Sequence, residues 1–111
     1  MLVGESAGET SRVPLMRVCF LEARGHDTLV TLADGTHLVS TRGIAQLEAE
    51  LSRMSGLFLK THRSYLVNLP HVRRITRRKV EMDTGDVLPI ARGRWEELNR
   101  AWLAWCRGTL A

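Results

Sequence analysis

The chain has 111 residues, of which 44% are hydrophobic and 25% charged, a balance typical of one folded domain with a modest core. No apolar run approaches the roughly 18 residues of a membrane-spanning helix. The opening residues also lack the basic and apolar regions of a signal peptide, so we expect a cytoplasmic protein with no membrane partner. Cys19 and Cys106 lie far apart within apolar patterns, which favours two buried thiols over a disulfide or a metal knuckle.

The net charge of +4 is unevenly distributed. Residues 1–52 contain four Lys or Arg against seven Asp or Glu, whereas residues 53–94 contain ten against three. A basic block of this kind favours a polyanionic partner, because neutralising phosphates releases counterions. A solvated basic face without a partner is the alternative.

The first half of the chain predicts strands followed by one helix. Residues 1–13 are rich in Gly, Ser and Glu and predict a flexible N-terminal segment or linker, with the folded domain over 14–111. Residues 15–22 and 28–32 predict two strands, with either Leu29 or Val30 on the core side. Asp34-Gly35 predicts a hairpin into a strand over 36–40. Ser40 or Thr41 can cap a helix to about Met54, whose apolar face would pack on the sheet.

The second half predicts further short strands and a final helix. Two strands flank residues 61–64, a hairpin covers 72–75 and 80–82, and a last strand covers 87–90. Residues 93–107 predict a helix with Trp95, Trp102 and Trp105 on one face, an arrangement that favours core or interface packing over base stacking. These patterns give about seven strands and two helices in a mainly antiparallel β domain.

Residues 58–68, FLKTHRSYLVN, place hydrogen-bond donors between two apolar runs. Arg63 can make a bidentate contact to guanine, and Lys60 and Ser64 can hold phosphates. Arg92 and Arg94 flank Gly93 at the predicted start of the last helix, where a helix N-terminus favours anions. The arginines at 73, 74, 77 and 78 and Lys79 add positive charge, or they form a solvated strand edge.

Other chemistries are not favoured. The four histidines lack metal-ligand spacing, and the chain has no phosphate loop, dinucleotide fingerprint or nucleophile elbow. We therefore expect no catalytic residues, no bound metal and no cofactor. A helix-turn-helix is excluded by the long β pattern between the two predicted helices. The alternative to DNA binding is a β-rich protein-interaction or sensory module with a basic face, and RNA binding is weaker because exposed strand aromatics are missing.

Residues 58–68 resemble the hallmark segment of the LytTR-type DNA-binding domain, the output module of many bacterial response regulators. The resemblance extends in the expected order over residues 18–32, 39–51 and 87–92. It implies about ten short strands in packed antiparallel sheets, with one internal helix and a C-terminal helix. It also implies a transcriptional regulator whose loops enter successive major grooves of double-stranded DNA and bend it.

The resemblance further implies specific contact residues. The implied base contacts are His26, with Asp27 as the alternative, Arg63 and Arg92. The implied DNA backbone contacts are Lys60, His62, Ser64, Asn68 and Arg94. Asn68 and Tyr65 have an alternative structural role in turn capping and core packing. Ala91 departs from the serine common in such domains. The partners implied are repeated DNA half-sites, a second copy of the chain in a homodimer, and a receiver or sensor domain outside this sequence.

Overall fold

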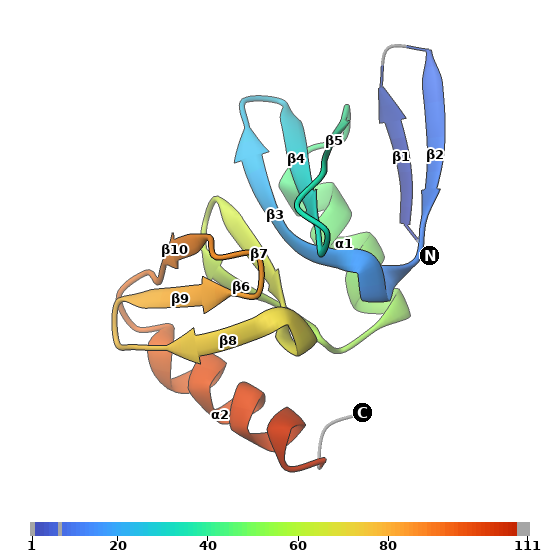
Figure 1. Cartoon of the computed structure of the whole chain (residues 1–111). Coiled ribbons are helices and arrows are strands. Elements are labelled where there is room, and N and C mark those ends of the chain that lie inside the picture. Colours follow the sequence, from blue (N-terminus) through green and yellow to red (C-terminus); the bar gives the residue numbers. More distant parts are fainter. Residues whose placement is uncertain (1, 7, 109–111) are drawn as a thin grey trace.

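The computed structural model describes residues 2–6 and 8–108, with side chains from residue 8 onward. These residues form ten strands in three antiparallel sheets and two α-helices (Figure 1), which confirms the predicted mainly β fold. The elements are β1 (Leu2–Ser6), β2 (Glu9–Val13), β3 (Val18–Arg24), β4 (Asp27–Leu32), β5 (His37–Ser40), α1 (Ile44–Met54), β6 (Phe58–His62), β7 (Tyr65–Asn68), β8 (Val72–Ile75), β9 (Lys79–Met82), β10 (Val87–Pro89) and α2 (Trp95–Cys106).

The central sheet has five strands in the order β5-β4-β3-β7-β6, and β3 and β7 form its middle. Phe20 lies opposite Val67, and Leu21 lies opposite Leu66. Successive strand residues point to opposite faces, so each strand supplies buried side chains to both faces of the sheet. This explains why the apolar residues in β3 and β7 are consecutive rather than alternating with polar ones.

One face of the central sheet packs against α1. Leu21, Val30 and Leu66 form a core with Leu47 and Leu51 of the helix. Of the two residues left open for the core side of β4, Val30 is the buried one. Truncating a fully buried leucine of this kind to alanine costs about 2–5 kcal/mol of stability, because the transfer and cavity terms add.

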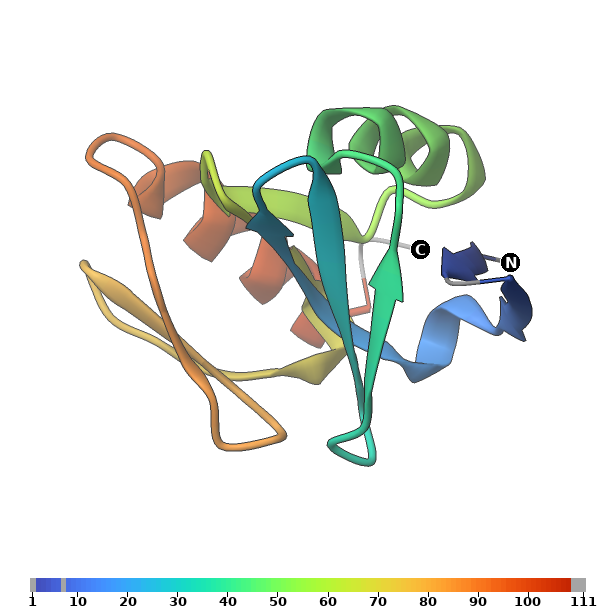
Figure 2. The ribbon, with the colours of Figure 1, turned by 90° about the horizontal axis from the view of Figure 1, so that it is seen from above.

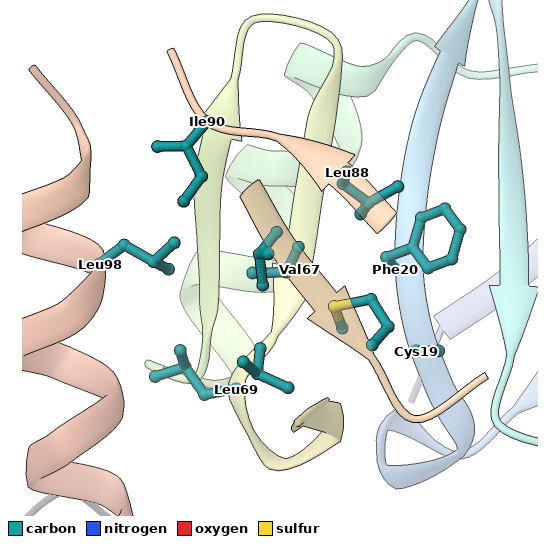
Figure 3. Close-up of a cluster of buried hydrophobic side chains, with 10 residues drawn as sticks. Cys19, Phe20, Val67, Leu69, Leu88, Ile90 and Leu98 are labelled. Carbon is teal, nitrogen blue, oxygen red and sulfur yellow. The ribbon is translucent and has the colours of Figure 1, made fainter. Parts of the chain in front are cut away.

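The other face packs against the three-stranded sheet β10-β9-β8 and against α2. Figure 3 shows Phe20 and Val67 from the central sheet beside Leu88, with Ile90 and Leu98 toward α2. Trp95, Trp102 and Trp105 pack against the same core and are partly buried, which confirms packing as the role predicted for the aromatic face of this helix.

The N-terminal residues differ from the prediction of a flexible segment or linker over 1–13. Residues 1 and 7 lie outside the described residues, but β1 and β2 pair along their whole length, from Leu2 opposite Val13 to Ser6 opposite Glu9. Gly8 occupies the left-handed region with φ 79° and permits the tight turn between them. Backbone pairing rather than an apolar pattern creates this hairpin, so its composition did not reveal it.

Three further predictions are corrected. The first predicted strand begins at Val18, because Leu15–Arg17 form a short 3-10 helix after Pro14. The N-cap of α1 is Gly43 rather than Ser40 or Thr41, since Ser40 is still paired with Thr28 in the sheet. Both cysteines are free, as predicted, but only Cys19 is buried, whereas Cys106 is exposed at the end of α2.

We expect Cys19 to make the fold sensitive to alkaline pH. Burial raises the pKa of the Cys19 thiol more than its hydrogen bonds with Thr84 lower it, and the charges of Asp83 and Asp86 add a smaller increase. The folded state therefore retains the proton that the unfolded chain loses above pH 9.0, and stability falls as pH rises through the folded pKa. Urea unfolding up to about pH 10.5 should show a steeper loss for the native chain than for Cys19→Ala. Parallel pH profiles would contradict this assignment.

Candidate nucleic-acid interface

Four turns lie along one edge of the molecule. They are the turns at Gly25–His26, Arg63–Ser64, Arg77–Arg78 and Arg92–Gly93, which we call the turn edge. In Figure 1 they follow one another down the left side, with the Arg92–Gly93 turn third and the Arg77–Arg78 turn last, and Figure 2 shows the same succession from above. The acidic turns at Asp34 and at Asp83–Asp86 lie at the opposite end of their hairpins. The fold thereby separates arginine-bearing turns from aspartate-bearing turns.

Backbone hydrogen bonds join neighbouring turns of this edge. The N–H of Ala23 donates to the carbonyl of Ser64 at 2.8 Å, and the N–H of Ala91 donates to Thr61 at 2.7 Å. The N–H of Ile90 donates to the carbonyl of Arg78 at 2.8 Å. The turns are therefore fixed relative to one another by the sheets, which is the condition for a recognition surface made of loops.

The central turn presents Arg63 to solvent. Its shape is set by His62, whose Nδ1 accepts a hydrogen bond from the N–H of Ser64 at 3.2 Å. The His62 ring also packs edge-to-face on Tyr65, with ring centroids 6.0 Å apart. In the neutral ring the other nitrogen then carries the proton and can donate outward. Arg63 and Ser64 thus lie at the tip of a braced turn.

The first turn places His26 at its exposed tip, after Gly25 with φ 61°. Asp27 belongs to β4 and lies opposite Arg24, so His26 rather than Asp27 is the outward turn residue. Glu22 holds Arg24 at 3.3 Å and accepts a hydrogen bond from the Tyr65 hydroxyl at 3.4 Å. Burial, followed by the charge of Glu22, raises the pKa of Tyr65, so this hydroxyl stays a donor. Sequence reasoning did not identify this tether, because Glu22 and Tyr65 become neighbours only through the β3–β7 pairing.

The turn after β10 carries Arg92 and Arg94 on either side of Gly93. Gly93 has φ 87°, a conformation that favours glycine, and the N–H of Arg94 donates to the Ala91 carbonyl at 3.1 Å. Arg94 is the N-cap of α2, so both arginines lie beside free N–H groups and the positive end of the helix dipole. Ala91 supplies no hydroxyl at this turn.

Two of the predicted DNA backbone contacts are engaged inside the protein. Asn68 is 1% exposed, and its Nδ2 donates to the carbonyls of Val18 at 2.8 Å and Leu15 at 3.2 Å. Its predicted contact with DNA is therefore corrected in favour of the structural alternative. Lys60 is half-buried and pairs with Glu48 of α1 at 3.4 Å, so it would have to exchange this partner for a phosphate.

The arginines of the turn edge are not neutralised internally. Within the described residues, Arg63, Arg92 and Arg94 form no ion pair with an acidic side chain. In contrast, Arg73 on β8 pairs with Glu81 at 2.7 Å and Arg42 pairs with Glu50. Cations left unpaired in a row are expected where a polyanion docks.

Further chemistry is sparse in the described part of the chain. No group of three or more His, Cys, Asp and Glu side chains there is arranged to hold a metal ion. In the same residues, no helix combines the length and apolar character needed to cross a membrane. The described turns therefore present arginines without an acidic partner on a rigid β scaffold, an arrangement that suits the backbone of a nucleic acid.

Comparison with known proteins gives the family. Residues 8–103 match the sequence model of the LytTr DNA-binding domain, and the chain belongs to this family of DNA-binding domains. The family is one of DNA-binding domains and not of enzymes.

Two similar proteins place this assignment in context. The CO-responsive transcriptional regulator RcoM of Rhodospirillum rubrum is 40% identical over 99 residues, which is 83% of this chain and 41% of the relative. The chain thus spans about two fifths of the length of this relative. A solved LytTr DNA-binding domain from Bacillus cereus has the same fold, with a TM-score of 0.70 and 24% identity over 92% of this chain and 94% of that one.

We expect Asn68→Ala to destabilise the fold without changing the DNA-binding surface. The substitution leaves the buried carbonyl of Val18 and the partly buried carbonyl of Leu15 without their donor and should cost about 2–4 kcal/mol. Urea unfolding measures this loss, and DNA affinity at a temperature where both proteins are folded should stay unchanged. Native-like stability combined with weakened DNA binding would instead place Asn68 at the interface.

Proposed function

We propose that this domain binds a specific sequence of double-stranded DNA through turns placed in the major groove, as the output module of a transcriptional regulator. The observation that carries the proposal is the turn edge itself. His26, Arg63 and Arg92 lie at exposed positions of three turns that backbone hydrogen bonds join. The similarity to RcoM, a transcriptional regulator, supports the regulatory part of the proposal.

The side chains on these turns suit separate tasks. Arg63 and Arg92 each carry a planar guanidinium that can make two parallel hydrogen bonds to guanine O6 and N7. His26 can donate or accept at a base edge according to its tautomer. His62, Ser64 and Arg94, with Lys60 after release from Glu48, would hold phosphates and fix the register of the turns on the duplex.

The same proposal extends to assembly. The domain would bind as a homodimer to repeated half-sites, because one turn edge reads too few base pairs to select a site in a genome. Since the matched relative is more than twice as long, a receiver or sensor domain would reside elsewhere in a longer cytoplasmic protein. Such a domain would sense the signal, and the turn edge would recognise the DNA sequence.

Selection from a random duplex pool, followed by sequencing, tests the proposed function and gives the half-site spacing. We expect enrichment of one motif that occurs twice at a fixed spacing. A salt titration of binding to random duplex DNA should give a strongly negative slope of log affinity against log salt. No enriched motif together with a slope near zero would overturn the proposal and favour an acidic protein partner.

Arg63→Ala should cost roughly 1–3 kcal/mol of binding free energy and relax specificity at one base pair. Arg53→Ala is the matched control, because Arg53 is also exposed but lies in the last turn of α1, away from the turn edge. Affinities for the selected duplex and its single-base variants measure both effects. An equal loss for every sequence would make Arg63 a phosphate contact only.

A further inference from the structure

The β8–β9 turn, residues 76–79, has a fixed shape and a fixed place at the end of the turn edge. The N–H of Thr76 donates to the carbonyl of Lys79 at 2.9 Å, and the N–H of Lys79 donates to the Thr76 hydroxyl at 3.2 Å. The bond from Ile90 to the Arg78 carbonyl ties this turn to the segment that leads into Arg92. Figure 2 shows it as the last of the four turns, beyond the turn that begins α2.

Arg77 is held in place by an aromatic ring. Its guanidinium lies over the ring of Trp95, 4.6 Å from the ring centroid, and Trp95 is itself packed against the core at the start of α2. Stacking of this kind uses the face of the guanidinium and leaves its N–H edges directed outward. Less side-chain entropy is then lost when those edges bind an anion.

The space between this turn and the start of α2 is a groove of about 710 Å³. Its lining includes Arg77, Arg78 and Arg92 with a single acidic residue, Glu96, and it opens at the N-terminus of α2. Arg77 and Arg78 form no ion pair within the described residues, whereas Arg73 of the same hairpin is neutralised by Glu81. The groove thus combines three cations and a helix N-terminus, a setting that suits phosphate groups.

We propose that the β8–β9 turn is a fourth DNA contact, in which Arg77 and Arg78 hold backbone phosphates that flank the bases read by the Arg92 turn. This inference rests on the proposed DNA binding and extends the site beyond the three base-reading turns. The contact adds affinity and footprint length on one side of each half-site. It adds no base specificity, because phosphates carry no sequence information.

The main test compares Arg77→Gln/Arg78→Gln with the matched double variant Arg53→Gln/Arg107→Gln. Arg53 and Arg107 are exposed at the C-terminal ends of α1 and α2. The N-terminal end of α1 lies beside His26 and that of α2 follows the Arg92 turn, so both control arginines are at the far ends of these helices. Loss of two phosphate contacts should reduce the magnitude of the salt slope by about 1.8 and affinity by roughly 30-fold at 0.15 M salt. The control pair should change neither quantity appreciably, and the base preference of both variants should equal that of the native domain.

Replacing single phosphates by uncharged groups locates the contact of Arg77 and Arg78 on the DNA. Methylphosphonate groups are placed at phosphates just outside the selected motif, first on one side and then on the other. We expect the native domain to lose affinity on one side only, and the Arg77→Gln/Arg78→Gln variant to be insensitive to that same change. Equal sensitivity of both proteins, or a salt slope equal to the control's, overturns the fourth contact. A native domain that binds no duplex refutes the proposed function itself.

Variants of Trp95 distinguish the positioning of Arg77 by the indole ring from the effect of the Arg77 charge. Trp95→Leu removes the ring beneath Arg77 without changing the net charge, and Trp95→Phe restores an aromatic face. We expect Trp95→Leu to weaken binding several-fold and to abolish most of the methylphosphonate sensitivity, with recovery in Trp95→Phe. Thermal unfolding confirms that each variant is folded. Binding by folded Trp95→Leu equal to that of the native domain would overturn the positioning role of Trp95.

Discussion

The pairing of β3 with β7 is the constraint on which the rest of the structure depends. Its register places Leu21 beside Leu66 on the face covered by α1, and Phe20 beside Val67 on the opposite face. A shift of one residue would send each side chain to the wrong core. The same pairing continues into the bond from Ala23 to Ser64, which sets the first turn beside the Arg63 turn. Core packing and turn alignment are therefore two results of one register.

The separation of basic turns from acidic turns depends on the same antiparallel architecture. In an antiparallel hairpin, successive turns alternate between the two ends of the sheet, so a chain can place its basic turns at one end and its acidic turns at the other. Asp34 and Asp83 occupy turns remote from Arg63 and Arg92. In contrast, Arg73 of β8 and Arg42 in the connection between β5 and α1 are paired with glutamates. The turn edge thus gathers arginines that have no acidic partner within the described residues, and this concentrates positive potential on one edge of a chain with a net charge of +4.

Local signals predicted much of this fold and of its site. The Asp34-Gly35 hairpin, the apolar face of α1 and the tryptophan face of α2 follow from spacing alone, and the donor-rich segment 58–68 pointed directly to the Arg63 turn. What the sequence could not provide were relations between distant segments. Asn68 resembles an exposed donor in its own segment, yet its partners lie about fifty residues earlier in the chain. Glu22 with Tyr65, and Arg77 with Trp95, are likewise joined only by tertiary structure.

The turn edge crosses from one sheet to another, and this has a mechanical consequence. The His26 and Arg63 turns belong to the central sheet, whereas the Arg77 turn belongs to the β10-β9-β8 sheet and the Arg92 turn follows its last strand. Their separation is set by the core between the sheets, where Phe20 and Val67 meet Leu88 and Ile90 (Figure 3). Since a packed core resists compression, the separation of the turns is nearly fixed. Any adjustment between the turns and a bound duplex would therefore have to be made by the DNA. On the proposed mode of binding, DNA whose grooves do not match this spacing would have to bend, and sequence-dependent deformability would then contribute to site selection alongside direct contacts.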